Sequence, residues 1–405
     1  MQRLYADLPL HYGQVPAWLY ERMNKLGVAI IESIVIEYGK EAVLARLSNP
    51  FWFQSLGCVL GMDWHSSGIT TSVLGALKRS VNKRSKELGI YICGGKGKYS
   101  KETPSELIKI GNDIGLNTSS LVRNSKLTAK VDNTAIQDGY QIYIHSFILT
   151  DTGEWAVIQQ GLCDKHSMAR RYHWYSPTIK SFVEEPHSFI YGKNEGDILN
   201  LTDHKADSTR AGILEITKED PDKMLAETRK LIMPRHHDVR AEDINLKRLG
   251  SILAVAHEKE GLDIESLLLL EGVGPRTLQS LALVSEMIYG TPTRFSDPAR
   301  YSFAHGGKDG HPFPVPTKVY DETIQTLEHV VSRAKLGNYD KRTALKNLTK
   351  AAQLLEKSFE PNNNYDELVA KERNESWKYG GRTVMGRAKR PSQKQNSALS
   401  QLSLF

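Results

Sequence analysis

The sequence lacks the features that would assign it to a membrane, secreted or disulfide-rich class. No apolar run approaches the ~20 residues that a membrane-spanning helix needs. The first residues, MQRLYADLPLHYG, lack the basic and apolar segments of a secretory signal peptide. The three cysteines, Cys58, Cys93 and Cys163, form no C-x-x-C pair, which argues against a disulfide framework or a thiolate zinc site. We therefore expect a cytoplasmic protein without a membrane partner.

The sequence also lacks an overall basic character in its body. The formal net charge of the 405 residues is +6. Residues 376–405 contain six basic residues and no Asp or Glu, so residues 1–375 are neutral as a whole. Any contact between the body and DNA must therefore come from local patches rather than from a basic surface.

Residues 1–205 are expected to form an α/β or α+β domain. Apolar residues recur at helical spacing over 16–39 and over 68–89, and each pattern ends at a glycine. Residues 140–161 contain two β-rich runs joined by the turn-forming Thr-Asp-Thr-Gly, and GIYICGG at 89–95 resembles a further short strand. We interpret this domain as the catalytic or substrate-binding part.

The rest of the chain is expected to be helical and then disordered. From about residue 220 the β-branched runs disappear, which indicates an all-helical domain over 206–338. Two helices are expected within 339–378, divided by a Pro-Asn-Asn-Asn turn. Residues 379–405 are rich in Gly, Arg, Lys, Ser and Gln, which predicts a disordered basic tail.

The tail ends in a short peptide of its own. Gln401, Leu402, Ser403, Leu404 and Phe405 resemble the Q-L-S/D-L-F peptide by which bacterial replication and repair proteins dock on the DNA polymerase sliding clamp. A tethered Gln amide and three apolar side chains suit a preformed groove with a polar rim. The resemblance implies the sliding clamp as a partner. The alternative is a chance match in a frayed terminus.

A second motif lies in the helical domain, in LLLLEGVGPRTLQSLALVSEMIYG at 267–290. It resembles the helix-hairpin-helix motif of DNA-repair proteins, in which a G-x-G turn joins two short helices. Gly272 and Gly274 permit the turn, and the helix that begins near Pro275 offers its N-terminal amides, with Arg276 and Thr277, to a phosphate. Such contacts bind DNA without reading its sequence. A glycine-rich turn between core helices is the alternative.

The resemblance extends toward the DNA glycosylases, whose hairpin is followed by a catalytic Asp in a short loop. Asp297 falls at the matching place in YGTPTRFSDP, although the spacing is about three residues longer. Arg276 stands where lyase-type members carry a Lys, and a guanidinium cannot form a Schiff base. Asp297 is therefore a candidate for stabilising an oxocarbenium-like centre, or simply a residue that caps a turn.

Three further segments contain candidate site residues. GMDWHSSG pairs Asp63 with His65, as an acid–base or metal pair or as a helix N-cap. GGKGKYS offers Lys96 and Lys98 beside three glycines, suited to a phosphate although the full P-loop spacing is absent. The loop YSFAHGGKDGHPFPVP contributes Lys308 to a phosphate or metal site, or is an exposed connection.

The β-hairpin and the ARRYHW motif after it supply the remaining candidates. The paired amides Gln159 and Gln160 end a buried strand, where each demands partners, which favours a polar site. For a metal nuclease that uses Mg²⁺ or Mn²⁺, the ligands would be Asp132, Asp138 and His145. The motif ARRYHW supplies Arg170, Arg171 and His173, with two aromatic rings, to neutralise and stack on a nucleic acid.

The motifs GMDWHSSGITT, GGKGKYS, QDGYQIY, WAVIQQG, ARRYHW and FAHGGKDG occur together and in this order. With them the chain resembles a bacterial and archaeal family known as domain of unknown function 763, from about residue 8 to residue 340. This resemblance implies no activity and no catalytic residues.

Together these patterns predict a DNA-repair or DNA-processing protein of the nucleoid that the sliding clamp recruits. The chemistry expected is cleavage of a phosphodiester or an N-glycosidic bond in DNA, by a nuclease or a glycosylase-like hydrolase. The alternative from another class is a non-catalytic sensor of DNA structure or damage at the clamp. A nucleotide-binding regulator is a third hypothesis, which rests on the GGKGK loop alone.

Overall fold

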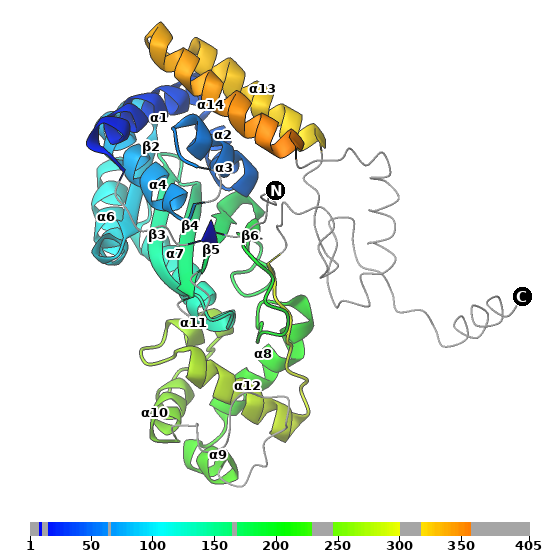
Figure 1. The fold of residues 1–405 in the computed structure, drawn as a ribbon. Coiled ribbons are helices and arrows are strands. Elements are labelled where there is room, and N and C mark those ends of the chain that lie inside the picture. The colour runs from blue at the N-terminus through cyan, green and yellow to red at the C-terminus, as the bar shows by residue number, and fades with distance from the viewer. Residues whose placement is uncertain are drawn as a thin grey trace, which may run out of the picture. The chain divides into compact units, whose positions relative to one another are not determined.

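A computed structural model of the chain describes residues 8–9, 15–63, 66–163, 168–228, 246–299 and 317–357 (Figure 1). The chain divides into two compact units, residues 1–358 and residues 359–405, and all described residues belong to the first. The domain boundaries expected near residues 205, 338 and 378 stay predictions. No described helix is long and apolar enough to cross a membrane.

The strands of the described residues form one antiparallel sheet. They are β1 (Leu8–Pro9), β2 (Ile90–Lys96), β3 (Gln141–Thr150), β4 (Trp155–Cys163), β5 (Met168–Tyr175) and β6 (Phe189–Tyr191). The order is β1-β5-β4-β3-β2, and β6 also pairs with β5. The register places Gln159 opposite Tyr172 and Gln160 opposite Arg171. The first part of the chain therefore contains both helices and an antiparallel sheet, which confirms the expected mixture of helix and strand.

The helices precede, interrupt and follow the sheet. They are α1 (Ala17–Tyr38), α2 (Lys40–Leu47), α3 (Pro50–Val59), α4 (Gly68–Val81), α5 (Ser85–Leu88), α6 (Lys98–Ile114), α7 (Thr118–Lys130), α8 (Asp207–Lys218), α9 (Pro221–Thr228), α10 (Leu246–His257), α11 (Ile264–Leu269), α12 (Pro275–Tyr289), α13 (Thr317–Arg333) and α14 (Asn338–Lys357). Single turns of 3-10 helix lie at Asn82–Arg84, Ser176–Thr178 and His204–Ala206, and a π-helix at Val131–Ala135 extends α7.

Several of these elements confirm the sequence patterns. The helix expected at 16–39 is α1, and the pattern at 68–89 is α4 followed by α5, which ends at Gly89 with a φ of 66°. Strands β3 and β4 form the expected hairpin, whose turn closes through a bond from Thr150 N to Glu154 O of 2.9 Å. The first expected C-terminal helix is α14. The second one, near 365–378, lies outside the described residues.

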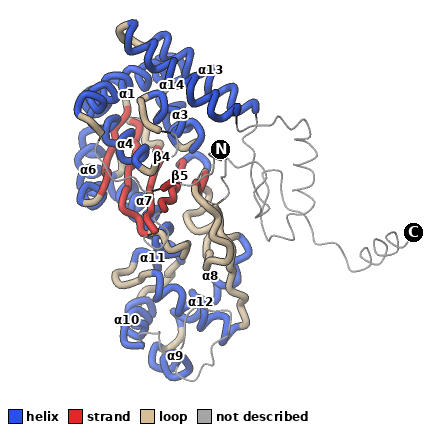
Figure 2. The backbone as a smooth tube through the Cα atoms, in the orientation of Figure 1, coloured by secondary structure: helices blue, strands red, loops and turns tan. Residues whose placement is uncertain are grey.

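Two apolar cores lie on the two faces of the sheet, because alternate strand residues point to opposite sides. One core joins Phe147, Val157 and Trp174 to buried residues of α7, α8 and α10–α12. The other joins Ile148 and Ile158 to α1–α4 and to the inner faces of α13 and α14. Figure 2 shows helices on both sides of the strands. Any polar group on β3, β4 or β5 therefore has to find its partners inside a covered layer.

Candidate functional site

The turn between α11 and α12 has the geometry that its glycines predict. Gly272 has a φ of 87°, in the left-handed region that favours glycine. Gly274 is the residue before α12 and has extended backbone, and a Cβ added there would meet nothing within 4 Å. The first helical bond runs from Leu278 N to Gly274 O at 3.0 Å, so the amides of Arg276 and Thr277 precede it. The helices α11 and α12 thus meet at a turn, and among the described residues the first amides of α12 remain free to bind another partner.

Two cations from distant parts of the chain reach this turn. Lys130, at the end of α7, donates to Val273 O at 2.7 Å. Arg248 of α10 donates to Gly272 O from Nε at 3.2 Å and from Nη2 at 2.9 Å. Burial, together with the neighbouring Arg248, lowers the pKa of Lys130. The turn carbonyls are thus covered by positive charge, which makes this end of α12 more attractive to an anion.

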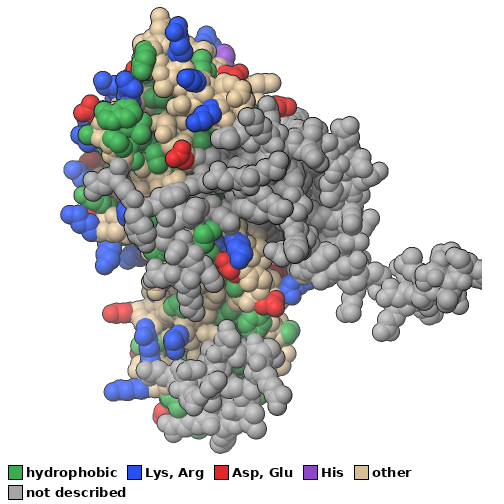
Figure 3. Space-filling model, viewed as in Figure 1, with side chains coloured by type: hydrophobic (Ala, Val, Ile, Leu, Met, Phe, Trp, Pro, Cys, Tyr) green, Lys and Arg blue, Asp and Glu red, His purple; other side chains and the backbone are tan. Residues whose placement is uncertain are grey.

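The two predicted residues after the turn differ in exposure. Arg276 is exposed, as a side chain that contacts a phosphate should be. Thr277 is only 7% exposed and its side chain packs inward. Its backbone amide, but not its hydroxyl, is therefore the group that could bind a phosphate. Figure 3 shows Lys and Arg side chains over the end of the helical part that carries α10.

The glycosylase interpretation of Asp297 is not supported by its surroundings. Its side chain is 0% exposed and accepts two bonds from Arg170, at 3.0 Å and 2.6 Å. The amides of Glu195 and Ala299 donate to the same carboxylate at 2.6 Å and 2.8 Å. All its strong acceptor positions are therefore taken, and Asp297 fastens the loop after α12 to β5 rather than facing a DNA base.

Asp138 belongs to the same buried group. It accepts from Arg170 at 2.8 Å, from the hydroxyl of Tyr172 at 2.5 Å and from the amide of Tyr140 at 3.0 Å. Burial raises the pKa of Asp138, against the pull of the Arg170 guanidinium. Arg170 is itself 0% exposed and lies between two carboxylates, so its side chain is not at the surface where the sequence analysis expects it to contact nucleic acid.

The structure does not bring Asp132, Asp138 and His145 together around one point, as the predicted metal site would need. Asp132 and His145 are separated by the amide of Gln159, which donates to Asp132 at 2.5 Å and accepts from His145 Nδ1 at 2.9 Å. Asp138 is held by Arg170 instead. Within the described parts of the chain, no group of three His, Cys, Asp or Glu side chains is placed to hold a metal ion.

The group around Asp132 is a closed network on one face of the sheet. His187 contacts Asp132 Oδ1 at 2.5 Å, and Trp174 donates to Oδ2 at 3.0 Å. Ser125 bonds to the other nitrogen of His145 at 2.8 Å. Burial raises the pKa of Asp132 and lowers the pKa of His145 to about 4. Gln159 therefore belongs to a buried polar network in which its partners are Asp132 and His145.

Gln160, Arg171 and His173 form a second network on the opposite face. Arg171 donates to His173 Nε2 at 2.9 Å and to Gln54 Oε1 at 2.9 Å. Its guanidinium also bonds to Thr70 of α4, which donates to Gln160. Burial lowers the pKa of Arg171 to about 10. All of these side chains are inside the protein, so Arg171 and His173 are not at the surface where the sequence analysis expects them to contact nucleic acid.

Two of the backbone amides in the GGKGK segment are bonded inside the protein. Glu106 accepts the amide of Gly94 at 2.6 Å, and Tyr143 O accepts the amide of Gly97 at 2.8 Å. A Cβ at Gly94 would lie 2.2 Å from His145 O, so this glycine serves strand packing. Lys96 and Lys98 are exposed at the end of β2 and the start of α6. Two cations thus remain at the surface beside the N-terminus of α6, while the amides of Gly94 and Gly97 are already bonded inside the protein.

The structure therefore brings together only part of the predicted site. Gln160, Arg171 and His173 converge on one face of the sheet, while Gln159 and Asp132 lie on the other. Asp63 is exposed, and no hydrogen bond joins it to either network within the described residues. The other predicted positions lie outside the described residues, namely His65, Lys308, Gln401, Leu402, Leu404 and Phe405.

Comparison with known proteins identifies the family. The model of the family described as "Protein of unknown function (DUF763)" matches residues 4–315. The chain belongs to this family. No curated protein and no solved structure matches the chain. The resemblance carried by the motifs is thus confirmed, and the function of this DUF763 protein must be argued from its own residues.

Sequence patterns alone miss the two cations that reach the turn of this DUF763 protein. Lys130 and Arg248 lie more than twenty residues before Gly272, on helices whose packing the sequence does not show. The side chains that close the Asp132 network, Ser125, His187 and Trp174, are missed for the same reason. Only a tertiary structure places such residues together.

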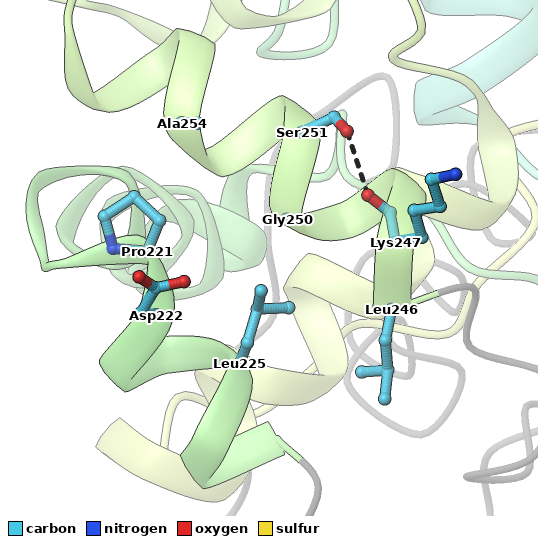
Figure 4. Close-up of a pocket in the computed structure, with 8 residues that line it drawn as sticks. All are labelled: Pro221, Asp222, Leu225, Leu246, Lys247, Gly250, Ser251 and Ala254. Atoms are coloured by element: carbon cyan, nitrogen blue, oxygen red, sulfur yellow. Dashed lines mark hydrogen bonds between the residues drawn. The ribbon is translucent and has the colours of Figure 1, made fainter.

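An open pocket of about 540 Å³ lies between α9 and α10 (Figure 4). Its lining includes Pro221, Leu225, Leu246 and Gly250, together with the charged residues Asp222 and Lys247. The one hydrogen bond drawn there runs from Ser251 Oγ to Lys247 O at 3.0 Å, within α10 itself. None of the residues predicted from the sequence lines this pocket, and it forms no part of the candidate site.

The low pKa of His145 predicts a loss of stability in acid. The unfolded chain protonates this histidine near pH 6.5, whereas the folded chain does so at about 4. Between these values the unfolded state binds more protons, so acidification favours unfolding. From pH 7.5 to pH 5.0 this contribution is about 2 kcal/mol. Urea denaturation at both pH values should show that His145→Gln loses correspondingly less stability than the native protein, and an equal loss would contradict the assignment.

Proposed function

We propose that the protein binds the phosphate backbone of duplex DNA through residues 270–276, the hairpin turn. The observation that supports this most strongly is the meeting of Lys130 and Arg248, from α7 and α10, at the turn carbonyls beside the N-terminus of α12. Bringing two cations together costs electrostatic energy, and a bound phosphate would offset that cost. Arg276 adds a third, exposed cation on the same turn.

We further propose that the terminal peptide 401–405 holds this DNA-binding body at the sliding clamp. The support is its resemblance to clamp-docking peptides and the basic, polar segment that precedes it. Between the two functions expected from the sequence, the geometry favours the non-catalytic sensor or adaptor. Three of the carboxylates considered for cleavage, Asp132, Asp138 and Asp297, are hydrogen-bonded to buried partners. The fourth, Asp63, is exposed.

A single substitution at the turn tests the DNA contact. Gly274→Asp fits without a steric clash and places an acceptor at the N-cap position, so the fold should be retained. Its negative charge should weaken binding to duplex DNA by about 1–3 kcal/mol. The loss should be equal for two duplexes of different sequence, because phosphate contacts do not read bases. Fluorescence anisotropy on the full chain measures both affinities.

The chain offers matched controls for this test. Gly274→Asn has the same shape and capping ability but no charge, so its affinity should stay close to that of the native protein. Arg276→Glu should lose more affinity than Arg276→Gln, because it reverses the charge rather than removing it. Full affinity in a correctly folded Gly274→Asp protein would contradict the proposal.

The choice of adaptor over enzyme needs a separate assay. Incubation with plain, nicked, mismatched, uracil-containing and alkylated duplexes, with and without Mg²⁺ or Mn²⁺, should give complexes and no products. Metal-dependent strand breaks would instead establish a nuclease, and alkali-labile sites a glycosylase.

A further inference from the structure

The solvent face of α14 carries a row of basic side chains. Arg342, Lys346 and Lys350 recur every four residues, and all three are exposed. At about 1.5 Å per residue, neighbours in the row are about 6 Å apart along the helix axis. Within the described part of the chain, none of the three has a hydrogen-bond or ion-pair partner.

This row differs from the cations around it. Three cations near this row each have a partner in the protein. Arg333 pairs with Glu37, Lys335 pairs with Glu32, and Lys341 donates to Ser332 O. Like charges four residues apart destabilise a helix. The row therefore leaves three positive charges unpaired side by side, whereas the cations around it are paired. The net charge of residues 1–375 is zero.

Exposed aromatic rings continue the row. Tyr339, one helical turn before Arg342, is 67% exposed, and Trp18 at the start of α1 is 61% exposed. The guanidinium of Arg22 lies between them, 5.5 Å from the Trp18 ring centroid and 5.2 Å from that of Tyr339. An arginine held between two rings fixes their positions and leaves ring surface in solvent.

The two helices form one continuous surface. The Arg22 contact with Tyr339 joins α1 to α14, and α14 also packs on α3 (Figure 1). Figure 3 shows Lys and Arg side chains over these upper helices. The acidic residues nearest in sequence are Glu21, beside Arg22, and the half-buried Asp340. Neither lies between Arg342 and Lys350, where the positive charge is uninterrupted.

We propose that this surface, the α1–α14 platform of Trp18, Arg22, Tyr339, Arg342, Lys346 and Lys350, binds single-stranded DNA. Phosphates lie along the cation row, and unpaired bases stack on the two rings. Stacking on aromatic rings combined with a basic track is how proteins hold single strands without sequence preference. A duplex does not fit the rings, because its bases are already stacked on each other. The choice of DNA rather than RNA follows from the proposed function, whereas the platform itself is separate from the hairpin turn.

The platform is tested with fluorescein-labelled oligodeoxythymidylate of 15 nucleotides and the full chain. Anisotropy titrations at several salt concentrations compare two variants. The charge variant Arg342→Gln, Lys346→Gln, Lys350→Gln should bind at least about tenfold more weakly, with the slope of log K against log salt reduced by about 2 units. The stacking variant Trp18→Ala, Tyr339→Ala should also lose about tenfold or more, with an unchanged slope.

Matched variants separate the platform from bulk charge and from folding. Lys83→Gln, Lys86→Gln, Lys218→Gln removes the same charge from exposed sites elsewhere, and should change affinity less than about twofold. Trp18→Phe, Tyr339→Phe keeps two rings and should bind nearly as the native protein does. Equal losses in the two triple variants, or native affinity in the stacking variant, would overturn the proposal. Gly274→Asp should leave oligothymidylate binding intact, so failure at the hairpin turn and failure at the platform are distinguishable.

Discussion

Replacing Arg170 by Met is expected to lower the free energy of unfolding by about 3–5 kcal/mol. The substitution leaves the carboxylates of Asp138 and Asp297 buried, with side-chain exposures of 1% and 0%, and without their cation. It also frees the loop after α12 from the sheet, since Asp297 holds that loop through Arg170. Removing one partner of a buried ion pair lowers the free energy of unfolding by more than the intact pair contributes to it, because an unpaired charge stays in the interior.

Urea denaturation of the Arg170→Met protein measures this loss. The control is Lys218→Met, which removes an exposed i,i+3 pair with Glu215 and should cost less than about 0.5 kcal/mol. If Arg170 instead contacted nucleic acid, as its motif suggests, the variant would keep its stability and lose DNA affinity. A stability loss no larger than that of the control would therefore contradict the buried role of Arg170.

Removing Gln401 to Phe405 is expected to abolish binding to the sliding clamp. Leu404→Ala with Phe405→Ala should have nearly the same effect, because these side chains supply the apolar surface that a groove would bury. The composition of the tail predicts that it adds no core, so stability should not change. Surface plasmon resonance with immobilised clamp measures the interaction.

The segment before the peptide sets how far the body can reach. The composition of residues 379–400 predicts a flexible linker with an expected average span of roughly 25 Å, enough for the body to contact DNA threaded through a clamp. Ser403→Ala is the matched control, since the resembling motif accepts Ser or Asp there, and it should retain binding. Clamp binding that persists after the five-residue deletion would refute the docking assignment, while leaving the hairpin proposal untouched.

Local patterns in the sequence predict much of the fold. The helix α1 and the β3–β4 hairpin follow from spacing and turn residues that act within a few positions of one another. The G-x-G turn before α12 is predicted for the same reason. By contrast, the sequence does not show that Glu106, from within α6, accepts the amide of Gly94 in the segment interpreted as a phosphate loop, at the end of β2.

The candidate site could be predicted only where its residues are neighbours in the sequence. Asp297 lies where a glycosylase carboxylate would, but its role is decided by Arg170, 127 residues earlier. In the same way, a strand motif such as ARRYHW shows that polar residues alternate, but not that helices cover both faces of the sheet. The cations at the hairpin turn depend on how α7 and α10 pack, which no local pattern contains.

The salt dependence of duplex binding tests the hairpin proposal most directly. Three cations, Lys130, Arg248 and Arg276, surround the turn, and each phosphate contact contributes about 0.9 to the slope of log K against log salt. The variant is Lys130→Gln, Arg248→Gln, Arg276→Gln. The fall of log K with log salt should be steeper for the native protein than for this variant, by about 2.5 to 3 units of slope. The basic tail is the same in both proteins, so its contribution cancels. Equal slopes for the two proteins would show that DNA does not bind at this turn.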